Sequence, residues 1–340
     1  MNAHRKIQQD IQGIGLEALL SVALKTRADD LFCREPARRE TWAGASKAQL
    51  THAQVDDQIR RLAALLSLSR LPEGSQVMIM TPMGPEQVIA MLAAQRAGLR
   101  PFLLPMSASA AQLQVQIDAA GPCVVLATTR CGDLEPARML RDAAARSFNA
   151  RLVCAFGPDV PDGVVPLDKV IASQARLPDI RPVSAGFAML PMVIETAYGT
   201  RQSVTETDIF AATLAIAREA RLNTSARVLS MMMSPSLCAL AAGPYLALLS
   251  GAEFLPLGLF SLSALWAGLA DGVNTCLVAP SSTEDALRKA GIVGHDSVAS
   301  LMLIHRHRPQ ALEPPGDHST RIFDLFSNAE HELEFSLRAA

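Results

Sequence analysis

The sequence predicts an α/β protein with two stacked lobes, each built on a mainly parallel sheet flanked by helices. Short apolar segments of strand length alternate with segments of helical period along most of the chain. This alternation is typical of strand–helix–strand units, in which the crossovers are right-handed and helices cover both faces of the sheet. A stretch rich in Pro, Asp and Gly interrupts it. We therefore expect a first lobe at 1–156, a linker at 157–184 and a second lobe at 185–340.

Composition limits the classes of function. The chain has 340 residues, 49% hydrophobic and 19% charged, which is enough to bury a large core. Its formal net charge of −2 argues against a broad basic surface for nucleic acid. The six cysteines are scattered, with no CxxC pair, so we expect a reduced, cytoplasmic protein.

One segment raises the question of a membrane span. Val228 to Ala252 holds no charged residue and is long enough to cross a bilayer. It also holds Pro235 and Pro244, several Ser and Gly residues, and no flanking basic cluster. We expect a buried strand, turn and helix instead, and no membrane span. The polar N-terminus does not have the pattern of a signal peptide.

In the first lobe, capping-box pairs mark two helix starts, at Thr51/Gln54 and at Ser109/Gln112. Pro85 suits the first turn of a helix and Gly98 its C-terminal cap. The predicted strands are Gln76–Met80, Pro101–Leu104, Cys123–Ala127 and Arg151–Phe156, and a further helix is predicted at Glu135–Ala145.

The second lobe repeats this rhythm, with a Thr205/Asp208 cap at the start of its first helix. Gly251 and Gly291 stand where left-handed C-terminal caps are expected. The predicted strands are Met189–Ile194, Arg227–Met233, Glu253–Leu257, Val273–Val278 and Arg321–Leu325, and the predicted helices are Thr205–Arg221, Leu237–Leu249, Leu262–Ala270 and Ser282–Ala290.

Three stretches, in order, resemble the large N-terminal region of the adenylate-forming (AMP-binding) superfamily of acyl-CoA synthetases and adenylation domains. LTHAQVDDQIRRLAALL with LPEGSQVMIM is similar to the family's "L-T-Y-x-E-L" helix and "G-D-x-V" turn and strand. The stretch from Pro82 to Leu126 resembles its helix ending in "A-G-A" and the strands that follow. The stretch from Thr205 to Leu257 resembles the region after its phosphate loop. The order and spacing, from about residue 15 to about residue 335, carry the resemblance.

The resemblance implies a reaction of a carboxylic acid with ATP and Mg²⁺. The products are an acyl-adenylate and pyrophosphate, and the acyl group then passes to coenzyme A or a carrier-protein thiol. Negative charge develops on the phosphates, so this chemistry requires placed hydrogen-bond donors, a lysine and a metal ion.

The family's phosphate loop is a Ser/Thr/Gly-rich run with a Pro-Lys end, and residues 195–204 stand in its place. Glu195 replaces the usual Ser, Arg201 the Pro and Gln202 the Lys, and only Arg201 adds a positive charge. The loop is therefore degenerate, and we favour a polar turn over a working phosphate site. A shifted alignment leaves a degenerate ATP site whose candidate residues are Thr196, Gly199, Thr200, Arg201 and Ser203.

The family's tyrosine-glycine-x-threonine-glutamate motif corresponds to residues 326–330. Phe326 keeps an aromatic residue for adenine, and Glu330 stands at the position of the Mg²⁺-binding carboxylate. Ala329 lacks the hydroxyl of the family's Thr. Glu330 also fits a plain acidic surface run.

Cys238 stands where the family often has the His of a Pro-x-x-His turn lining the acyl pocket. A lone Cys in an apolar stretch is usually a packed hydrophobic residue, so we do not expect a thiol nucleophile. His305 and His307 suggest a solvated basic loop more than a metal site.

These observations predict an impaired or inactive homologue that acts by binding a ligand or a partner; the catalytic residues are unknown. The sequence stops at Ala340, before the catalytic C-terminal domain that the resemblance implies. One alternative is an active ligase whose missing residues come from another chain or an absent segment. Another is an unrelated α/β binding protein. ATP or AMP with Mg²⁺, a small carboxylic acid, a thiol acceptor if the chain is active, and a protein partner or homodimer remain open.

Overall fold

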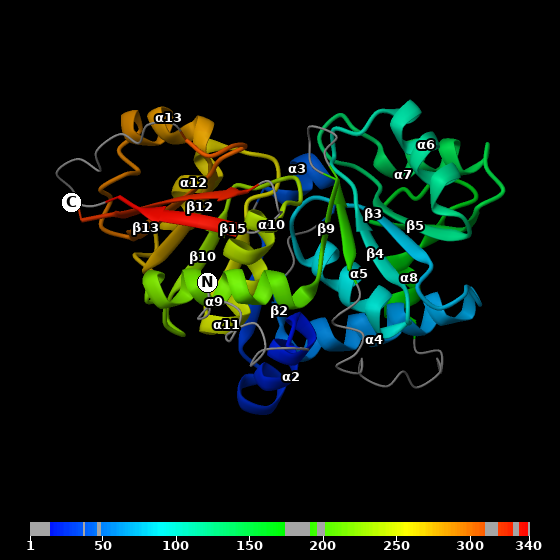
Figure 1. Cartoon of the computed structure of the whole chain (residues 1–340), viewed down its shortest axis with the longest axis horizontal. Coiled ribbons are helices and arrows are strands. Elements are labelled where there is room, and N and C mark those ends of the chain that lie inside the picture. Colours follow the sequence, from blue (N-terminus) through cyan, green and yellow to red (C-terminus); the bar gives the residue numbers. More distant parts are fainter. Residues whose placement is uncertain are drawn as a thin grey trace.

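The computed structural model describes residues 14–36, 38–45, 49–173, 191–195, 201–309, 319–328 and 333–338. Two mainly parallel sheets lie side by side, with helices on both faces of each (Figure 1). The predicted fold class is confirmed.

The first sheet has seven strands in the order β7-β6-β5-β3-β4-β8-β9, and only the β8–β9 pair is antiparallel. Its central strands, buried on both faces, read as apolar runs, as expected for a parallel sheet covered by helices. The strands are β3 (Gln76–Met80), β4 (Arg100–Leu103), β5 (Cys123–Thr128), β6 (Ala150–Phe156), β7 (Val165–Pro166), β8 (Met192–Glu195) and β9 (Arg201–Val204).

The second sheet has eight strands in the order β15-β14-β13-β12-β10-β11-β1-β2, with antiparallel pairs at its two edges. The strands are β1 (Leu31–Arg34), β2 (Gln49–Thr51), β10 (Arg227–Ser230), β11 (Glu253–Pro256), β12 (Thr275–Pro280), β13 (Val298–Ile304), β14 (Arg321–Ser327) and β15 (Leu333–Leu337).

The helices form three layers, two outside the sheets and one between them (Figure 1). Capping boxes open α4, α6 and α9, as their sequences predict. The helices are α2 (Leu16–Arg27), α3 (Arg39–Ala43), α4 (His52–Leu68), α5 (Pro85–Arg96), α6 (Ala110–Ala120), α7 (Pro136–Ala144), α8 (Leu167–Ala172), α9 (Glu206–Ala220), α10 (Leu237–Leu240), α11 (Leu246–Ser250), α12 (Leu262–Leu269) and α13 (Glu284–Lys289).

Hydrophobic clusters follow these layers. The largest joins the facing sides of both sheets with the central helices, and α5 is buried at every position except Glu86. A second cluster lies between the seven-stranded sheet and α6 and α7. A third lies between the eight-stranded sheet and α12 and α13. Since the largest core spans both sheets, the two lobes share their interior.

The expected linear division of the chain does not coincide with the sheets. β1 and β2, from the expected first lobe, belong to the eight-stranded sheet. β8 and β9, from the expected second lobe, complete the seven-stranded sheet. Part of the expected linker is ordered as β7 and α8, and residues 174–184 lie outside the described ranges. Strand pairing between distant segments thus crosses the boundary that composition suggests.

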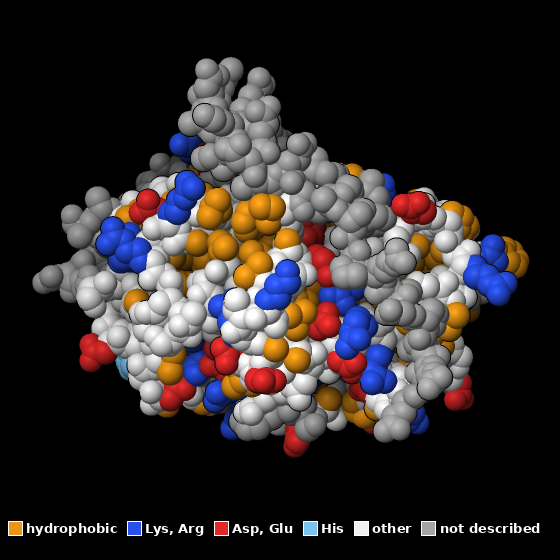
Figure 2. Space-filling model, turned by 90° about the horizontal axis from the view of Figure 1, so that it is seen from below, with side chains coloured by type: hydrophobic (Ala, Val, Ile, Leu, Met, Phe, Trp, Pro, Cys, Tyr) orange, Lys and Arg blue, Asp and Glu red, His pale blue; other side chains and the backbone are white. Residues whose placement is uncertain are grey.

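The uncharged stretch from Val228 to Ala252 forms β10, α10, a π-helical turn at Ala241–Tyr245, α11 and the turn that leads into β11. Most of its residues are buried and none is exposed, and Pro244 lies within the π-helical turn. Among the described residues, no helix has the length and apolar character to cross a membrane. The face in Figure 2 carries acidic and basic side chains interspersed, with hydrophobic side chains gathered near its centre.

Glu206, at the first position of α9, is 1% exposed and joins three elements. The Leu16 N–H of α2 donates to its Oε2 over 2.6 Å, in place of a cap from Gly15, which has no side chain. Gln95 Nε2 and Tyr245 Oη donate to its Oε1 over 2.9 and 2.8 Å. Burial raises the pKa of Glu206, although these hydrogen bonds act to lower it.

Candidate functional site

The position of the phosphate loop lies between β8 and β9, which form an antiparallel hairpin. In this register Glu195 lies opposite Arg201. Thr196, Gly199 and Thr200 lie outside the described residues. The two ends of the loop are described, and both carry residues that replace the family's pattern.

Glu195 is 2% exposed, and its Oε2 accepts a hydrogen bond from Gln116 Nε2 of α6 over 2.6 Å. Arg201 Nε lies 3.4 Å from the same oxygen, and Arg201 Nη2 donates to Gln116 Oε1. The guanidinium also lies over the Phe102 ring, 5.6 Å from its centroid. Glu195, Gln116 and Arg201 thus form a closed triad.

This triad reduces the positive charge that the loop position can offer to a phosphate. Arg201, the one positive charge added to the loop, is directed at a carboxylate of the same hairpin. The two charges cancel, so the described ends of the loop offer no net positive charge to a triphosphate. Two unit charges 4 Å apart interact by about 4 kcal/mol near a protein surface, so the placement of such charges decides anion affinity.

Along β9, the residues that follow Arg201 are alternately buried and exposed. Gln202, at the position of the family's Lys, is buried, and its Nε2 donates to Ser327 Oγ at the end of β14 over 3.3 Å. Ser203 points to the other face of β9 and is exposed. The side chain that the resemblance aligns with the family's lysine is therefore neutral, and it forms a contact between the two sheets.

Phe326 on β14 is 5% exposed, and the Arg308 guanidinium lies over its ring at 5.6 Å from the centroid. Arg308 Nη1 lies 3.7 Å from Glu334 Oε2, and Asn328 Nδ2 donates to Glu334 Oε1. An adenine ring would have to displace Arg308 to stack on that face. Glu330, the predicted metal ligand, lies outside the described ranges, within which no three His, Cys, Asp or Glu side chains are grouped around a metal-sized space.

Cys238 lies in the first turn of α10 and is 3% exposed. Burial raises the pKa of its thiol to about 12, so the thiol is protonated at neutral pH. Its interpretation as a packed hydrophobic residue agrees with this placement.

The sequence did not indicate a buried charge network that joins the middle of β14 to the residues directly after β13 and β15. Asp324 is fully buried and lies 2.7 Å from His305 Nε2, and Arg338 donates to both its oxygens over 2.7 and 2.8 Å. Arg338 also bonds Glu284 of α13. Burial alone would raise the pKa of Asp324, but hydrogen bonds from Arg338 and His305 hold it below its ordinary value. His305 thus belongs to a largely buried hydrogen-bonded network and not to a solvated loop.

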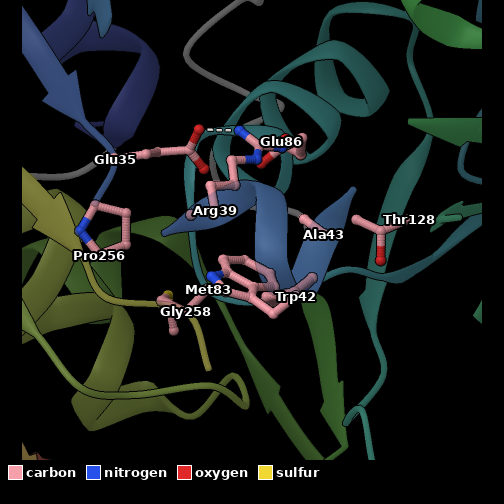
Figure 3. Close-up of a pocket in the computed structure, with 11 residues that line it drawn as sticks. Glu35, Arg39, Trp42, Ala43, Met83, Glu86, Thr128, Pro256 and Gly258 are labelled. Atoms are coloured by element: carbon pink, nitrogen blue, oxygen red, sulfur yellow. Dashed lines mark hydrogen bonds and ion pairs between the residues drawn. The ribbon is translucent and has the colours of Figure 1, made fainter. Parts of the chain in front are cut away.

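A second buried charge cluster joins the two sheets around a small cavity (Figure 3). Arg39 of α3 binds Glu35, which follows β1, and Glu86 in the first turn of α5. The cavity beside it has a volume of about 10 Å³, room for one water, and Thr128 and Gly258 line it. Burial lowers the pKa of Arg39. This cluster fastens the sheets together and holds no space for a substrate.

The model of the family described as AMP-binding enzyme matches residues 31–181. This confirms the resemblance drawn from the sequence. The matched range ends before the hairpin at β8 and β9, so the AMP-binding match does not include the phosphate-loop position. A search of curated protein sequences found no match.

Solved structures of acyl-activating ligases share the fold at low identity. A long-chain-fatty-acid CoA ligase from Rhodopseudomonas palustris superposes with a TM-score of 0.73 at 15% identity, over 95% of this chain and 78% of that one. The anthranilate CoA ligase AuaEII, solved with anthranoyl-AMP, gives 0.74 at 12%, over 95% and 62%. MbtA from Mycobacterium smegmatis gives 0.71 at 19%, over 98% and 62%. The chain thus spans less than two thirds of the length of the latter two relatives.

Proposed function

We propose that this chain descends from AMP-dependent acyl-activating enzymes but does not adenylate a carboxylic acid on its own, and acts by binding a ligand or a protein partner. The observation that carries the proposal is the triad of Glu195, Gln116 and Arg201. At the described ends of the loop, the side chains of Glu195, Arg201 and Gln202 already bind other groups of the protein.

Two further observations support it. Gln202 and Phe326, at positions where the resemblance implies a lysine and an adenine contact, bind Ser327 and Arg308 instead. The family match stops at residue 181 although the structural likeness to AuaEII extends over 95% of the chain. The fold has thus been kept where the residue pattern of the phosphate loop has not. Loss of one transition-state donor typically costs about 10²–10³ in rate, and several replaced groups cost more.

The test is ATP–pyrophosphate exchange by this chain with a panel of aliphatic and aromatic carboxylic acids and Mg²⁺. We expect no exchange above the level without protein. Robust exchange by the chain alone would show that it is an active ligase and refute the proposal. Thermal unfolding with ATP and Mg²⁺, AMP or coenzyme A then identifies the ligand, since a compound at 100 times its Kd adds about 2.7 kcal/mol of stability.

A charge variant tests the explanation itself. Replacing Glu195→Ser together with Gln202→Lys removes an anion and adds a cation at the loop. We expect ATP affinity to rise by at least about tenfold, or about 1.4 kcal/mol. Asp285→Ser together with Ala286→Lys makes the same change of two charges at exposed positions of α13, which packs on the other sheet, and is the matched control. An equal gain in this control would mean that only the overall charge matters, and the triad would lose its role.

A further inference from the structure

Helix α2 is held at both ends by buried ionisable side chains from other elements. At its start, the Leu16 N–H donates to Glu206 of α9 over 2.6 Å. The turn after its end packs on the first turn of α4, where the Asp30 carbonyl accepts from the backbone N–H of His52 over 3.2 Å and from its Nδ1 over 3.0 Å. Glu206 and His52 are 1% and 2% exposed. Both side chains thus lie inside the protein where α2 docks.

The contact at the end of α2 fixes the proton of His52. A carbonyl oxygen can only accept, so Nδ1 carries the hydrogen and a neutral ring leaves Nε2 without one. The ring lies beside Phe32 of β1, with centroids 5.7 Å apart. Burial lowers the pKa of His52 and Arg27 acts in the same direction, whereas Asp30 and the backbone carbonyls act to raise it. The positive end of the α4 dipole also disfavours a charged ring.

The start of α2 has the opposite preference. Its own Glu17 faces Glu206 and, with burial, favours the protonated carboxyl. Arg96 of α5 is bound by Glu17 over 2.8 Å and by Asp56 of α4 over 2.6 Å. Asp56 lies one turn after His52 on the same helix. Among the described residues, the hydrogen-bond donors to Glu206 are uncharged.

We propose that α2 and the turn at residues 28–30, which we name the α2 latch, dock most firmly when Glu206 is protonated and His52 is neutral. Docking covers both groups. A Cβ built on Gly15 would overlap the Glu206 carboxylate, and the Asp30 carbonyl lies on the His52 ring. Release of the latch lets water reach both side chains, which then titrate as ordinary Glu and His residues.

The two anchors respond to pH with opposite sign. The pKa of Glu206 is raised in the docked state, so its contribution is complete below 4.5 and is lost as pH rises. The pKa of His52 is lowered, so its contribution is complete above 6.5 and is lost as pH falls. Between these two values the losses offset each other. Docking of the latch therefore depends little on pH in the wild-type chain, and removal of either anchor reveals the response of the other.

Hydrogen exchange of the α2 amides, corrected for intrinsic rates, tests the latch between pH 4.5 and pH 6.5. In the wild type we expect protection factors to change by less than about threefold. Glu206→Gln should lose protection as pH falls, by up to about tenfold per pH unit, because one proton is linked to docking. His52→Gln retains an amide that can donate to Asp30, and it should lose protection as pH rises, within the same limit. The double variant should show neither slope.

Two matched controls remove the same titrating groups from the surface. Glu219→Gln lies on α9 like Glu206, at a side chain that is 48% exposed, and His307→Gln lies in the exposed segment after β13. Both should reproduce the wild-type profile. The amides of β12, in the interior of the eight-stranded sheet, distinguish release of α2 from global unfolding.

Each single variant is decisive by itself, because a latch with one titrating anchor cannot have a flat profile. A flat profile in either variant, or slopes of the same sign in both, overturns the proposal. Slopes that appear equally in the amides of β12 would assign the effect to global stability and overturn the latch as well.

Discussion

Arg201 is a cation at the position of the phosphate loop, as its sequence shows, but its partner is a carboxylate of the same protein. By sequence it is the only added cation in a loop that stands where phosphates bind in the family. In the structure it pairs with Glu195, its partner across the hairpin. Each of the two replacements alone would leave an unmatched charge, and together they compensate each other. The sequence shows both residues but not the register that brings them together.

Gly258 gives a prediction at the same scale. Its φ is +64°, and a Cβ there would lie 2.2 Å from Cζ2 of Trp42. Gly258→Ala should lower the free energy of unfolding by about 2–4 kcal/mol, from backbone strain and overpacking together. Urea unfolding measures this, and Trp42 emission should shift in the folded state.

Gly74→Ala is the control for that variant. Gly74 has a φ of +78° but no atom within 4 Å of a built Cβ. It should therefore show the backbone cost alone, about 1 kcal/mol. Equal losses in the two variants would mean that Trp42 moves aside without cost.

At the scale of elements, the first N–H of α2 is capped by a buried carboxylate of α9. Glu206 accepts the Leu16 N–H from 190 residues away, and its other donors among the described residues, Gln95 and Tyr245, are uncharged. Glu17 of α2 raises its pKa further, and Arg96 of α5 is engaged by Glu17 and Asp56. The docking of α2 is therefore linked to the protonation of Glu206.

The pH dependence follows from the raised pKa of Glu206. Its contribution to stability is fully present below its ordinary pKa of 4.5 and is lost as pH rises through the folded value. Glu206→Gln keeps an acceptor for Leu16 and does not ionise. Relative to wild type, this variant should gain stability as pH increases from about 4 to about 8, because only the wild-type carboxyl has to ionise in a buried site.

Unfolding by urea at several pH values, with hydrogen exchange of the α2 amides corrected for intrinsic rates, gives the measurement. Glu206→Leu serves as the control, since it removes the acceptor and should loosen α2 at every pH. A constant difference between wild type and Glu206→Gln across pH would show that Glu206 keeps one protonation state.

At the scale of the whole molecule, the two sheets are joined by charge as well as by a common core. Arg39 connects Glu35, after a strand of the eight-stranded sheet, to Glu86 on the central helix α5. Removing one member of a buried ion cluster leaves its counter-charges in a poorly hydrated site. The Arg39 cluster is thus a sensitive point for the arrangement of the lobes.

Arg39→Met should cost about 3–5 kcal/mol in unfolding free energy, because both carboxylates lose this cation. The triple variant with Glu35→Gln and Glu86→Gln should recover most of that loss, since no buried charge then remains to be compensated. Urea unfolding at neutral pH compares the two. Failure of the triple variant to recover would assign the loss to packing of the Arg39 side chain.

The fold class was predictable because it depends on local patterns. Helical period, strand-length apolar runs and the Thr51, Ser109 and Thr205 capping boxes each involve residues three or four positions apart. The burial of residues 228–252 was also predictable from the sequence, since the prolines and small residues of this segment suit an interior turn. The assignment of every strand to its sheet was not predictable from the sequence, because β1, β2, β8 and β9 pair with strands far away in the chain.

The candidate site was predictable only in part. Residue types at the phosphate-loop position indicated degeneracy, and the structure adds that Glu195 and Arg201 neutralise each other. Asp324 carried one overlooked signal, a carboxylate inside an apolar strand. Gln116 and Glu206 carried none, since a polar residue on a helix is ordinarily solvated.

By itself the sequence determined two α/β lobes and a phosphate loop without its usual residues. Only the tertiary structure decided which charged side chains pair, that Glu206 accepts the first N–H of α2, and which side of α12 is exposed. The reason is physical: local periodicity and caps arise from neighbours in the chain, whereas pairing and burial depend on strand register and on segments tens to hundreds of residues apart.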